Sequence, residues 1–359
     1  MISDKAPDFL TVLQDFDGVG VVVRRDQLTG TWIFCAIHDD TLGPATGGCR
    51  MKVYDHPVDG LMDALRLAQG MTNKWAAMDF PFGGGKTVLA IPRPLGKEER
   101  RGLLHRFGAL LNSLGGRYGT GADLGTTTED MHTIAEVSEY VIGVHGRTEG
   151  PMDPSPYTAL GVQEGIRSAV HHKFKRAGLA GRRILVQGVG SVGATLATDL
   201  AADGAHLLIS DIDEARARAL AELLGREFVP AGEVYSASCD VYAPCAIGAT
   251  LGPDTIPLLE CAIVAGAANN QLQTPADADA LHKRGILYAP DYVINGGGAM
   301  AFTLIYQGVD DLGELDRRVR AIGIRLEGIF TEAAMTGLSP MVSAQALVDR
   351  VLARGPKQV

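Results

Sequence analysis

The sequence predicts an α/β protein of two domains, one of them built on a doubly wound parallel sheet. Three observations predict this class. The chain has 359 residues, and domains usually contain about 100–200. A full G-x-G-x-x-G turn joins a short apolar run to a segment whose apolar residues recur at helical spacing. Further short apolar runs then follow at the spacing of alternating strands and helices.

The strongest signal is a strand–turn–helix–strand unit over residues 184–211. Residues 184–186 form a short β-branched run, typical of a buried parallel strand. The glycine turn follows, and helical spacing then continues until Gly204. A second apolar run, residues 207–209, leads to Asp211. A glycine turn in this setting indicates a Rossmann-type fold that binds a dinucleotide.

Each glycine of the turn has a physical task. Gly188 permits the tight turn, Gly190 lets the backbone approach the pyrophosphate, and Gly193 lets the helix pack closely on the strand. Asp211 follows at about the expected ~20 residues and can accept hydrogen bonds from a ribose 2′-hydroxyl. Because a carboxylate there repels a 2′-phosphate, NAD is predicted rather than NADP. The predicted cofactor site begins with Gly188, Val189, Gly190, Ser191, Val192, Gly193 and Asp211.

Composition excludes several classes of protein. The net charge of −9 argues against nucleic acid as a bulk electrostatic partner. Neither a signal peptide nor a membrane span is expected, so we expect a cytoplasmic enzyme. No metal site is predicted, because the five cysteines are scattered and His171 and His172 point different ways on a helix.

In the first part of the chain, residues 20–23 and 31–37 are predicted strands, and residues 42–50 a glycine-rich loop ending in a cation suited to a small ligand. A helix follows over residues 61–75, with Asp59 as its expected cap. Glycines then lead into a strand at residues 88–91. Further on, the pattern predicts a helix at 103–114, a small-residue loop at 119–127 and a helix capped by Thr127 or Thr128.

The motif Gly85-Lys86-Thr87 suggests a phosphate-binding P-loop, but the Walker pattern requires a glycine where Phe80 stands, and a strand replaces the helix. We therefore exclude a nucleoside triphosphatase. Instead, the glycines are expected to expose Lys86 to a crowded, partly dry site. A desolvated lysine can act as a general base near neutral pH. Asp123 either makes a turn or pairs with Lys86.

The Pro-rich stretch 150–156 predicts the domain boundary, giving a substrate domain at 1–150 and a Rossmann domain at 151–329. Helices are predicted at 158–172 and at 315–350 with a break near 337–340, and residues 330–359 are expected to pack back on the first domain. Additional strands are predicted at residues 240–243, 262–265 and 286–288. Loops after these strands are expected to hold the nicotinamide.

These features resemble the NAD-dependent amino acid dehydrogenases of the glutamate/leucine/phenylalanine/valine superfamily, on the leucine and phenylalanine side. The resemblance covers about residues 10–345. It is carried by the segments TLGPATGGCR (41–50), DALRLAQGMTNK (63–74), PFGGGKTV (81–88), GADLGTTTEDM (121–131), PSPYTALGV (154–162), VQGVGSVG (186–193), CDVYAPCAIG (239–248), VAGAANNQL (264–272) and YAPDYVINGGG (288–298).

The resemblance implies roles for single residues. Lys74 would bind the substrate α-carboxylate, Lys86 would be the general base that activates water, and Asp123 would shuttle the amine-side proton. Thr158 would contact the nicotinamide carboxamide. Asn269 would bridge the substrate carboxylate and the nicotinamide ribose. The loops after the strands would add Cys245, Ala246 and Asn295 to the cofactor site.

The family's side-chain pocket maps to Thr46, Gly47, Gly121, Ala299 and Phe302. No basic residue stands at these positions, which disfavours glutamate. Leucine enzymes tend to have larger aliphatic residues at the positions of Thr46 and Ala299, and valine at the position of Phe302. The shape of the pocket is therefore altered in this chain. The leucine-type segments favour branched-chain substrates, and phenylalanine or another aromatic amino acid is the alternative.

The resemblance implies reversible oxidative deamination in a cleft that closes between the two domains, by a homo-oligomer. Two other classes of function stay open at this stage. One is an inactive dinucleotide-binding sensor, which the joint presence of both lysines, Asp123 and Asn269 disfavours. The other is a 2-hydroxy acid dehydrogenase, which would need a paired histidine. His206 and His282 lack a convincing carboxylate partner in the sequence.

Overall fold

The computed structural model describes residues 8–144, 153–309 and 311–356. Its chain divides into two compact units. Unit 1 comprises Met1–Met152, Ile305–Asp310 and Val348–Val359, and unit 2 comprises Asp153–Leu304 and Asp311–Leu347. The boundary predicted after residue 150 lies outside the described residues. Of the stretch 330–359, which was expected to pack on the first domain, only the residues from Val348 onward belong to unit 1. Residues 330–347 belong to unit 2.

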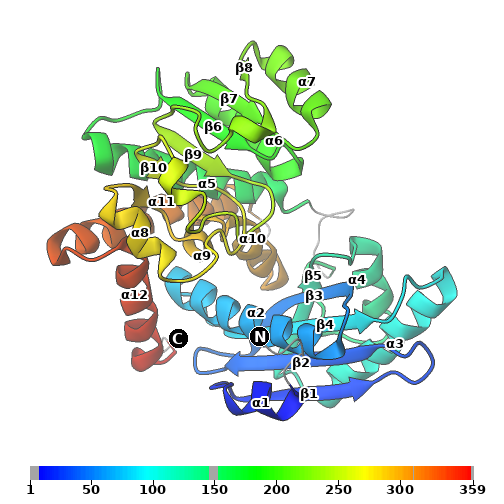
Figure 1. The fold of residues 1–359 in the computed structure, drawn as a ribbon. Helices are drawn as coiled ribbons and strands as arrows, with labels where there is room; N and C mark the ends of the chain where they lie inside the picture. Colours follow the sequence, from blue (N-terminus) through cyan, green and yellow to red (C-terminus); the bar gives the residue numbers. More distant parts are fainter. Residues whose placement is uncertain (1–7, 145–152, 310, 357–359) are drawn as a thin grey trace, which may run out of the picture. The chain divides into compact units, whose positions relative to one another are not determined.

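Unit 1 is built on a mixed five-stranded sheet (Figure 1). Its strand order is β1-β2-β4-β3-β5, and β3 runs parallel to both of its neighbours. The pairs β1–β2 and β2–β4 are antiparallel. The strands are β1 (Gly20–Arg25), β2 (Trp32–Asp39), β3 (Ala45–Val53), β4 (Gly83–Ile91) and β5 (Tyr118–Ala122).

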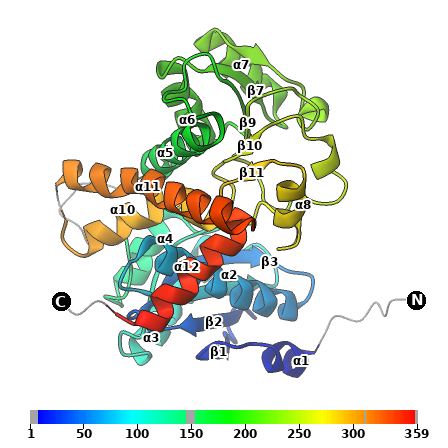
Figure 2. The ribbon, with the colours of Figure 1, turned by 90° about the vertical axis from the view of Figure 1, so that its left-hand side faces the viewer.

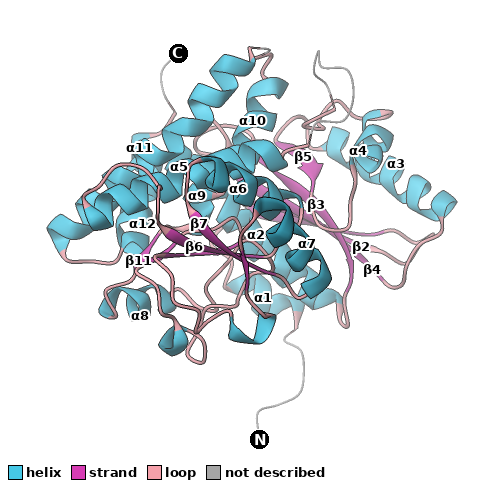
Figure 3. Cartoon of the chain, turned by 90° about the horizontal axis from the view of Figure 1, so that it is seen from above, coloured by secondary structure: helices cyan, strands magenta, loops and turns pink. Residues whose placement is uncertain are grey.

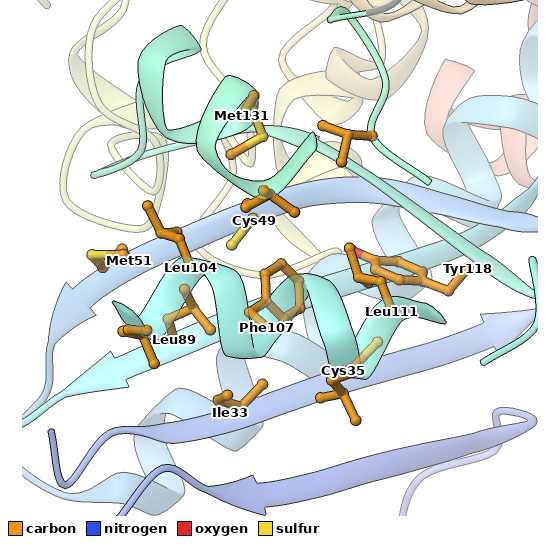
Figure 4. Close-up of a cluster of buried hydrophobic side chains, with 14 of the residues drawn as sticks. Ile33, Cys35, Cys49, Met51, Leu89, Leu104, Phe107, Leu111, Tyr118 and Met131 are labelled. Atoms are coloured by element: carbon orange, nitrogen blue, oxygen red, sulfur yellow. The ribbon is translucent and has the colours of Figure 1, made fainter. Parts of the chain in front are cut away.

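Alternate residues of each strand point to opposite faces of this sheet, so both faces carry apolar side chains. Helices pack on both faces. Phe34 and Ala36 on β2 pack against the apolar stripe of α2, whereas Ile33 and Cys35 face α3 and α4. Figure 4 shows the second cluster, in which Phe107 of α3 lies among the strand side chains. The helices of unit 1 are α1 (Phe9–Gln14), α2 (Pro57–Met78), α3 (Lys97–Ser113) and α4 (Thr128–Ala135).

Unit 1 corrects four expectations from the sequence. Most of the predicted loop 42–50 is strand β3, and the loop at 119–127 begins inside β5, because a strand can be glycine-rich where neighbouring backbone approaches closely. The glycines before Lys86 lie within β4. Asp59 does not precede α2; it lies in the first turn, where Oδ2 accepts from the His56 N–H at 3.2 Å.

Unit 2 contains a six-stranded sheet in which every pairing is parallel. Read from β8, the order is β8-β7-β6-β9-β10-β11, so the chain winds outward from β6 in one direction and then from β9 in the other. This is the doubly wound arrangement, with its switch point between β6 and β9. The strands are β6 (Arg183–Gln187), β7 (His206–Ser210), β8 (Glu227–Phe228), β9 (Val241–Pro244), β10 (Ile263–Val264) and β11 (Leu287–Tyr288).

Helices flank the strands of unit 2 (Figure 3). Two of them, α5 and α11, lie side by side (Figure 2), and Gly161 and Gly165 of α5 face Ile322 and Leu326 of α11. The α-helices from here on are α5 (Ser155–Phe174), α6 (Ser191–Ala202), α7 (Glu214–Leu224), α8 (Asp277–Lys283), α9 (Asp291–Ile294), α10 (Gly297–Tyr306), α11 (Leu312–Thr336) and α12 (Pro340–Arg354). Short 3₁₀ turns occur at Ala231–Glu233 and Ile256–Leu258.

No helix in the described ranges is long and apolar enough to cross a membrane. Within the same ranges, no group of three or more His, Cys, Asp or Glu side chains could hold a metal ion.

Candidate functional sites

Unit 1 places a cation inside its sheet. Lys86 lies on β4, whose nine residues are all buried, and it is only 4% exposed. Val88 and Ala90 on the same strand face α2, so Lys86 points to that side as well. Its Nζ lies 2.9 Å from Oδ1 of Asp123, at the end of β5. The two residues that the sequence singled out therefore meet as a largely buried ion pair.

Asp123 is held by a second cation on its other oxygen. Nε of Arg50, on β3, donates to Asp123 Oδ2 at 2.9 Å. The backbone N–H of Asp123 donates to Thr126 Oγ1 at 2.9 Å, which fixes the residue at the strand end. Burial opposes ionisation of this carboxyl, but the charges of Lys86 and Arg50 outweigh it and lower the pKa of Asp123 to about 2. Asp123 is therefore an anion throughout the physiological range.

A second carboxylate extends the cluster, and the sequence did not single it out. Arg50 Nη1 donates to Asp63 Oδ2 at 2.8 Å, and the Tyr54 hydroxyl donates to the same oxygen at 2.7 Å. Arg66 pairs with the other oxygen of Asp63 at 2.7 Å. One feature of the sequence could have identified Asp63: it lies between the buried apolar positions Leu61 and Ala64 of α2, where a charged side chain needs partners.

The glycines around Lys86 provide space for close packing. A Cβ on Gly48 would lie 2.7 Å from Asp123 Cβ and 3.1 Å from Lys86 Nζ. A Cβ on Gly84 would lie 2.2 Å from the backbone N of Thr72 on α2, and one on Gly85 would lie 2.7 Å from the ring of Tyr118. Because these glycines have no Cβ atom, α2 and the neighbouring strands can pack closely around the ion pair.

The remaining predicted residues of unit 1 lie on α2, β3 and β5. Lys74 is half-buried on α2, one turn after Met71, whose side chain would lie 3.3 Å from a Cβ on Gly47. Thr46 is buried, and its carbonyl accepts from the Trp75 Nε1–H at 3.3 Å. Gly121, also assigned to the side-chain pocket, is paired with Gly48 across β3 and β5.

The glycine turn of unit 2 lies at the switch point of its sheet. Gly188 has φ +92°, which favours glycine, and a Cβ there would lie 2.7 Å from Ala246 Cβ. A Cβ on Gly193 would lie 1.9 Å from the Gly188 carbonyl oxygen and 3.3 Å from Cys245 Cβ. The predicted cofactor residues after β6 and β9 thus pack together.

The start of α6 has room for a phosphate. Gly190 is its N-cap residue, with no side-chain cap, and a Cβ there would have no heavy atom within 4 Å. Ser191 and Val192 form the first turn, where backbone N–H groups and the helix dipole favour anions. Open space and uncapped donors at one helix end fit a dinucleotide pyrophosphate.

Asp211 stands just past β7, only 5% exposed, and its carboxylate already has donors. Oδ2 accepts from the Val189 N–H at 2.7 Å, and Oδ1 accepts from the Asp213 N–H at 2.8 Å and from Arg216 Nη2 at 2.9 Å. Burial opposes ionisation, but these donors leave the pKa of Asp211 below its usual value. The sequence did not anticipate a cation on this carboxylate.

The loop after β10 presents an oriented amide. Asn295 is buried, and its Nδ2 donates to Asn269 Oδ1 at 2.8 Å and lies 3.3 and 3.4 Å from the carbonyl oxygens of Ala267 and Ala268. Because carbonyls only accept, the NH₂ of Asn295 must face them, and Asn269 must offer its oxygen. The Asn269 NH₂ is left to donate from an exposed side chain.

The other predicted residues of unit 2 lie on α5 and α10. The Thr158 hydroxyl donates to the Pro154 carbonyl at 3.0 Å, and Thr158 Oγ1 would be 2.4 Å from a Cβ on Gly298. Ala299 and Phe302 follow on α10 and are half-buried.

Comparisons with known proteins agree on one family. A family model described as "Glu/Leu/Phe/Val dehydrogenase, dimerisation domain" matches residues 21–140, and one described as "Glutamate/Leucine/Phenylalanine/Valine dehydrogenase" matches residues 208–306. The leucine dehydrogenase of Bacillus subtilis is 39% identical over 343 residues, 95% of this chain and 93% of the relative.

Two solved structures are also similar. The L-tryptophan dehydrogenase of Nostoc punctiforme has a TM-score of 0.83 and 35% identity, covering 96% of this chain and 98% of that one. The hetero-hexameric glutamate dehydrogenase of Thermus thermophilus has a TM-score of 0.73 and 25% identity, covering 94% and 89%.

Proposed function

The chain belongs to the Glu/Leu/Phe/Val dehydrogenase family and is an amino acid dehydrogenase acting on a CH–NH₂ group, and we propose that it deaminates leucine and other branched-chain L-amino acids with NAD. The observation that carries this proposal is the buried Lys86–Asp123 pair in a chain that also has the dinucleotide turn. Lysine and carboxylate together can move protons to and from water and an amine.

The residues of unit 1 would carry the proton chemistry. Lys74 would bind the substrate α-carboxylate with its ammonium group. Lys86, once without its proton, would take a proton from the water that attacks the imine. Asp123, ionised as its lowered pKa requires, would pass the proton that the amine nitrogen gains or loses. The carbinolamine would then collapse to a 2-oxo acid and ammonium.

The residues of unit 2 would hold the cofactor. Members of the family are NAD(P)-dependent dehydrogenases, and bound NAD supplies the acceptor for the hydride from the substrate Cα. Residues 188–193 with Cys245 and Ala246 would hold the pyrophosphate, and Asp211 the adenosine ribose. Thr158 and Asn295 would hold the nicotinamide. Asn269 would donate from its outward NH₂ to a carboxylate or hydroxyl oxygen.

Leucine is proposed because the B. subtilis relative is named a leucine dehydrogenase. The alternative is an aromatic substrate, which the likeness to L-tryptophan dehydrogenase supports. The residues proposed to choose between them are Thr46, Gly47 and Gly121 in unit 1 and Ala299 and Phe302 in unit 2. None carries a positive charge, so a second carboxylate on the substrate would have no partner among them.

We expect a cytoplasmic homo-oligomer assembled through unit 1, because the family model over residues 21–140 is described as a dimerisation domain. Light scattering on purified protein measures the assembly state. A monomer at micromolar concentration would contradict this part of the proposal.

The proposed function is tested by following NADH absorbance with a panel of L-amino acids at alkaline pH, with NAD and NADP in parallel. We expect turnover with leucine, isoleucine or valine and little with glutamate. Faster turnover of phenylalanine or tryptophan would replace the branched-chain assignment with the aromatic one. Binding of NADH, followed by its fluorescence, without turnover of any amino acid would favour an inactive sensor and overturn the enzyme proposal.

A further inference from the structure

Arg50 is a largely buried charged residue beside the Lys86–Asp123 pair that the proposed chemistry leaves without a task. It lies on β3 with its side chain 18% exposed, and it bridges two carboxylates. Nε donates to Asp123 at 2.9 Å and Nη1 to Asp63 at 2.8 Å. Holding two acids at once fixes the plane of the guanidinium and the position of Asp123.

The charges of the cluster balance differently at the two stages of catalysis. With Lys86 protonated, Asp123 has a cation on each oxygen. When Lys86 has given up its proton, Arg50 alone compensates Asp123, while Arg66 and Arg50 share Asp63. Arg50 cannot lose its proton in a protein, so its charge is present at both stages.

The other titratable groups around the cluster add no uncompensated negative charge to this balance. Cys49 lies next to the pair on β3, and burial raises its pKa far above the usual range, so it stays a neutral thiol. Asp130 on α4 is already paired with Arg100 of α3 at 2.6 Å. Tyr54 stays protonated, because burial and the hydrogen bond to Asp63 raise its pKa.

We propose that Arg50 is a positioning residue that keeps Asp123 ionised and in place while Lys86 is without its proton. The inference rests on the proposed function, since it assigns to Arg50 a task in the same proton chemistry. Without Arg50, loss of the Lys86 proton would leave the Asp123 carboxylate without either of the two cations that now contact it. Asp63 acts one step further out, by holding Arg50 with the help of the Tyr54 hydroxyl.

The test is the pH dependence of kcat/KM between pH 7 and 11 for wild type, Arg50→Gln, Arg50→Lys and Arg66→Gln. A neighbouring charge moves a titration by about 1–3 pH units. We therefore expect the acid limb of the kcat/KM profile of Arg50→Gln to lie at least about one pH unit higher than that of wild type. At pH 8 the variant's kcat/KM should then be lower by about tenfold or more, and the difference from wild type should become smaller at pH 10.5. Arg50→Lys keeps the positive charge but not the planar guanidinium that donates to both carboxylates. Its acid limb should therefore lie closer to the wild-type position than that of Arg50→Gln.

Arg66→Gln is the matched control. Arg66 is half exposed and pairs with the outer oxygen of Asp63, so its loss should leave the acid limb in place. NADH fluorescence titration and thermal unfolding report whether each variant is folded. A loss in Arg50→Gln by the same factor at every pH would show a merely structural role and overturn the proposal, as would an unchanged profile. Absence of turnover in the wild type would instead refute the proposed function.

Discussion

The cluster around Lys86 in unit 1 and the glycine turn of unit 2 are built on opposite principles. Lys86 is 4% exposed and its Nζ lies 2.9 Å from the Asp123 carboxylate, whereas a Cβ on Gly190 would have no heavy atom within 4 Å. The cluster around Lys86 depends on charge balance inside a packed sheet. The glycine turn depends on open space and backbone N–H donors. Substitutions should therefore act through charge in unit 1 and through volume in unit 2.

A second contrast lies in the two carboxylates, Asp123 and Asp211. Each is held by an arginine at 2.9 Å. Arg50 is 18% exposed at its side chain and Arg216 is 52% exposed, so water screens the second pair far more than the first. We expect large effects from the first pair and small ones from the second.

The largest effect is expected from Lys86→Ala. Removing the proposed base should lower kcat by about 10²–10⁴-fold, the usual contribution of general base catalysis. NADH binding should persist, because the nucleotide turn lies in unit 2. Steady-state kinetics and NADH fluorescence measure the two, and Lys97→Ala, an exposed lysine at the start of α3, is the control. A Lys86→Ala enzyme with most of its activity would refute the assignment of the base.

In unit 2, Gly193→Ala and Gly190→Ala form a matched pair of changes in volume. The new Cβ at position 193 would lie 1.9 Å from the Gly188 carbonyl oxygen, so the turn must shift, and overpacking of this kind destabilises by about 1–3 kcal/mol. Gly190→Ala meets no atom and should keep the melting temperature, yet weaken NADH binding where the pyrophosphate approaches. Equal melting temperatures and equal NADH affinities for the two variants would contradict the proposed cofactor site.

Acid should unfold unit 1 before unit 2. In unit 1, hydrogen bonding to Arg106 lowers the pKa of Asp26 to about 2, and the cations around Asp123 do the same against the effect of burial. Because these folded-state values lie below the unfolded ones, the stabilisation is present above about pH 4 and is lost as the pH falls toward 2. Each contributes about 2 kcal/mol.

Urea unfolding between pH 5 and 2 measures this loss, with intrinsic fluorescence reporting on unit 1, where Trp32 and Trp75 lie. Asp26→Asn should flatten the dependence in this range. A transition of unit 1 that is independent of pH would show that neither carboxylate is held below its unfolded pKa.

The smallest effect is expected from Arg216→Ala. Its guanidinium offsets the charge of Asp211, the group expected to repel a 2′-phosphate. Exposed ion pairs contribute about 0.2–1 kcal/mol, so preference for NAD over NADP should rise only by a few fold, measured as the ratio of kcat/KM values. A fall in that ratio would mean that Arg216 does not help to bind a 2′-phosphate.

Local patterns in the sequence predicted the first βαβ unit of unit 2. The run 184–186, the glycine turn and Asp211 predicted β6, α6 and β7 in order, because a βαβ unit is encoded by residues close together in the chain. The helices α11 and α12 and the break between them followed from spacing in the same way. Roles of single residues came from the family resemblance and remain proposals.

Unit 1 shows where this reasoning stops. Residues 45–50 and 83–85 were expected to be loops or turns, because their glycines have little intrinsic preference for strands. They are strands because α2 and Tyr118 pack where side chains would otherwise stand. Such close approach is decided between segments far apart in the chain, which no local pattern records.

The sequence by itself determined the fold class, the order of most elements and the candidacy of Lys86 and Asp123. Only the tertiary structure decided that Arg50 joins Asp123 to Asp63. Asp123 lies 73 positions from Arg50 in the sequence, and Asp63 lies 13. The physical reason is that a buried charge must find its counter-charge in space, and a folded sheet brings that partner from wherever in the chain it lies.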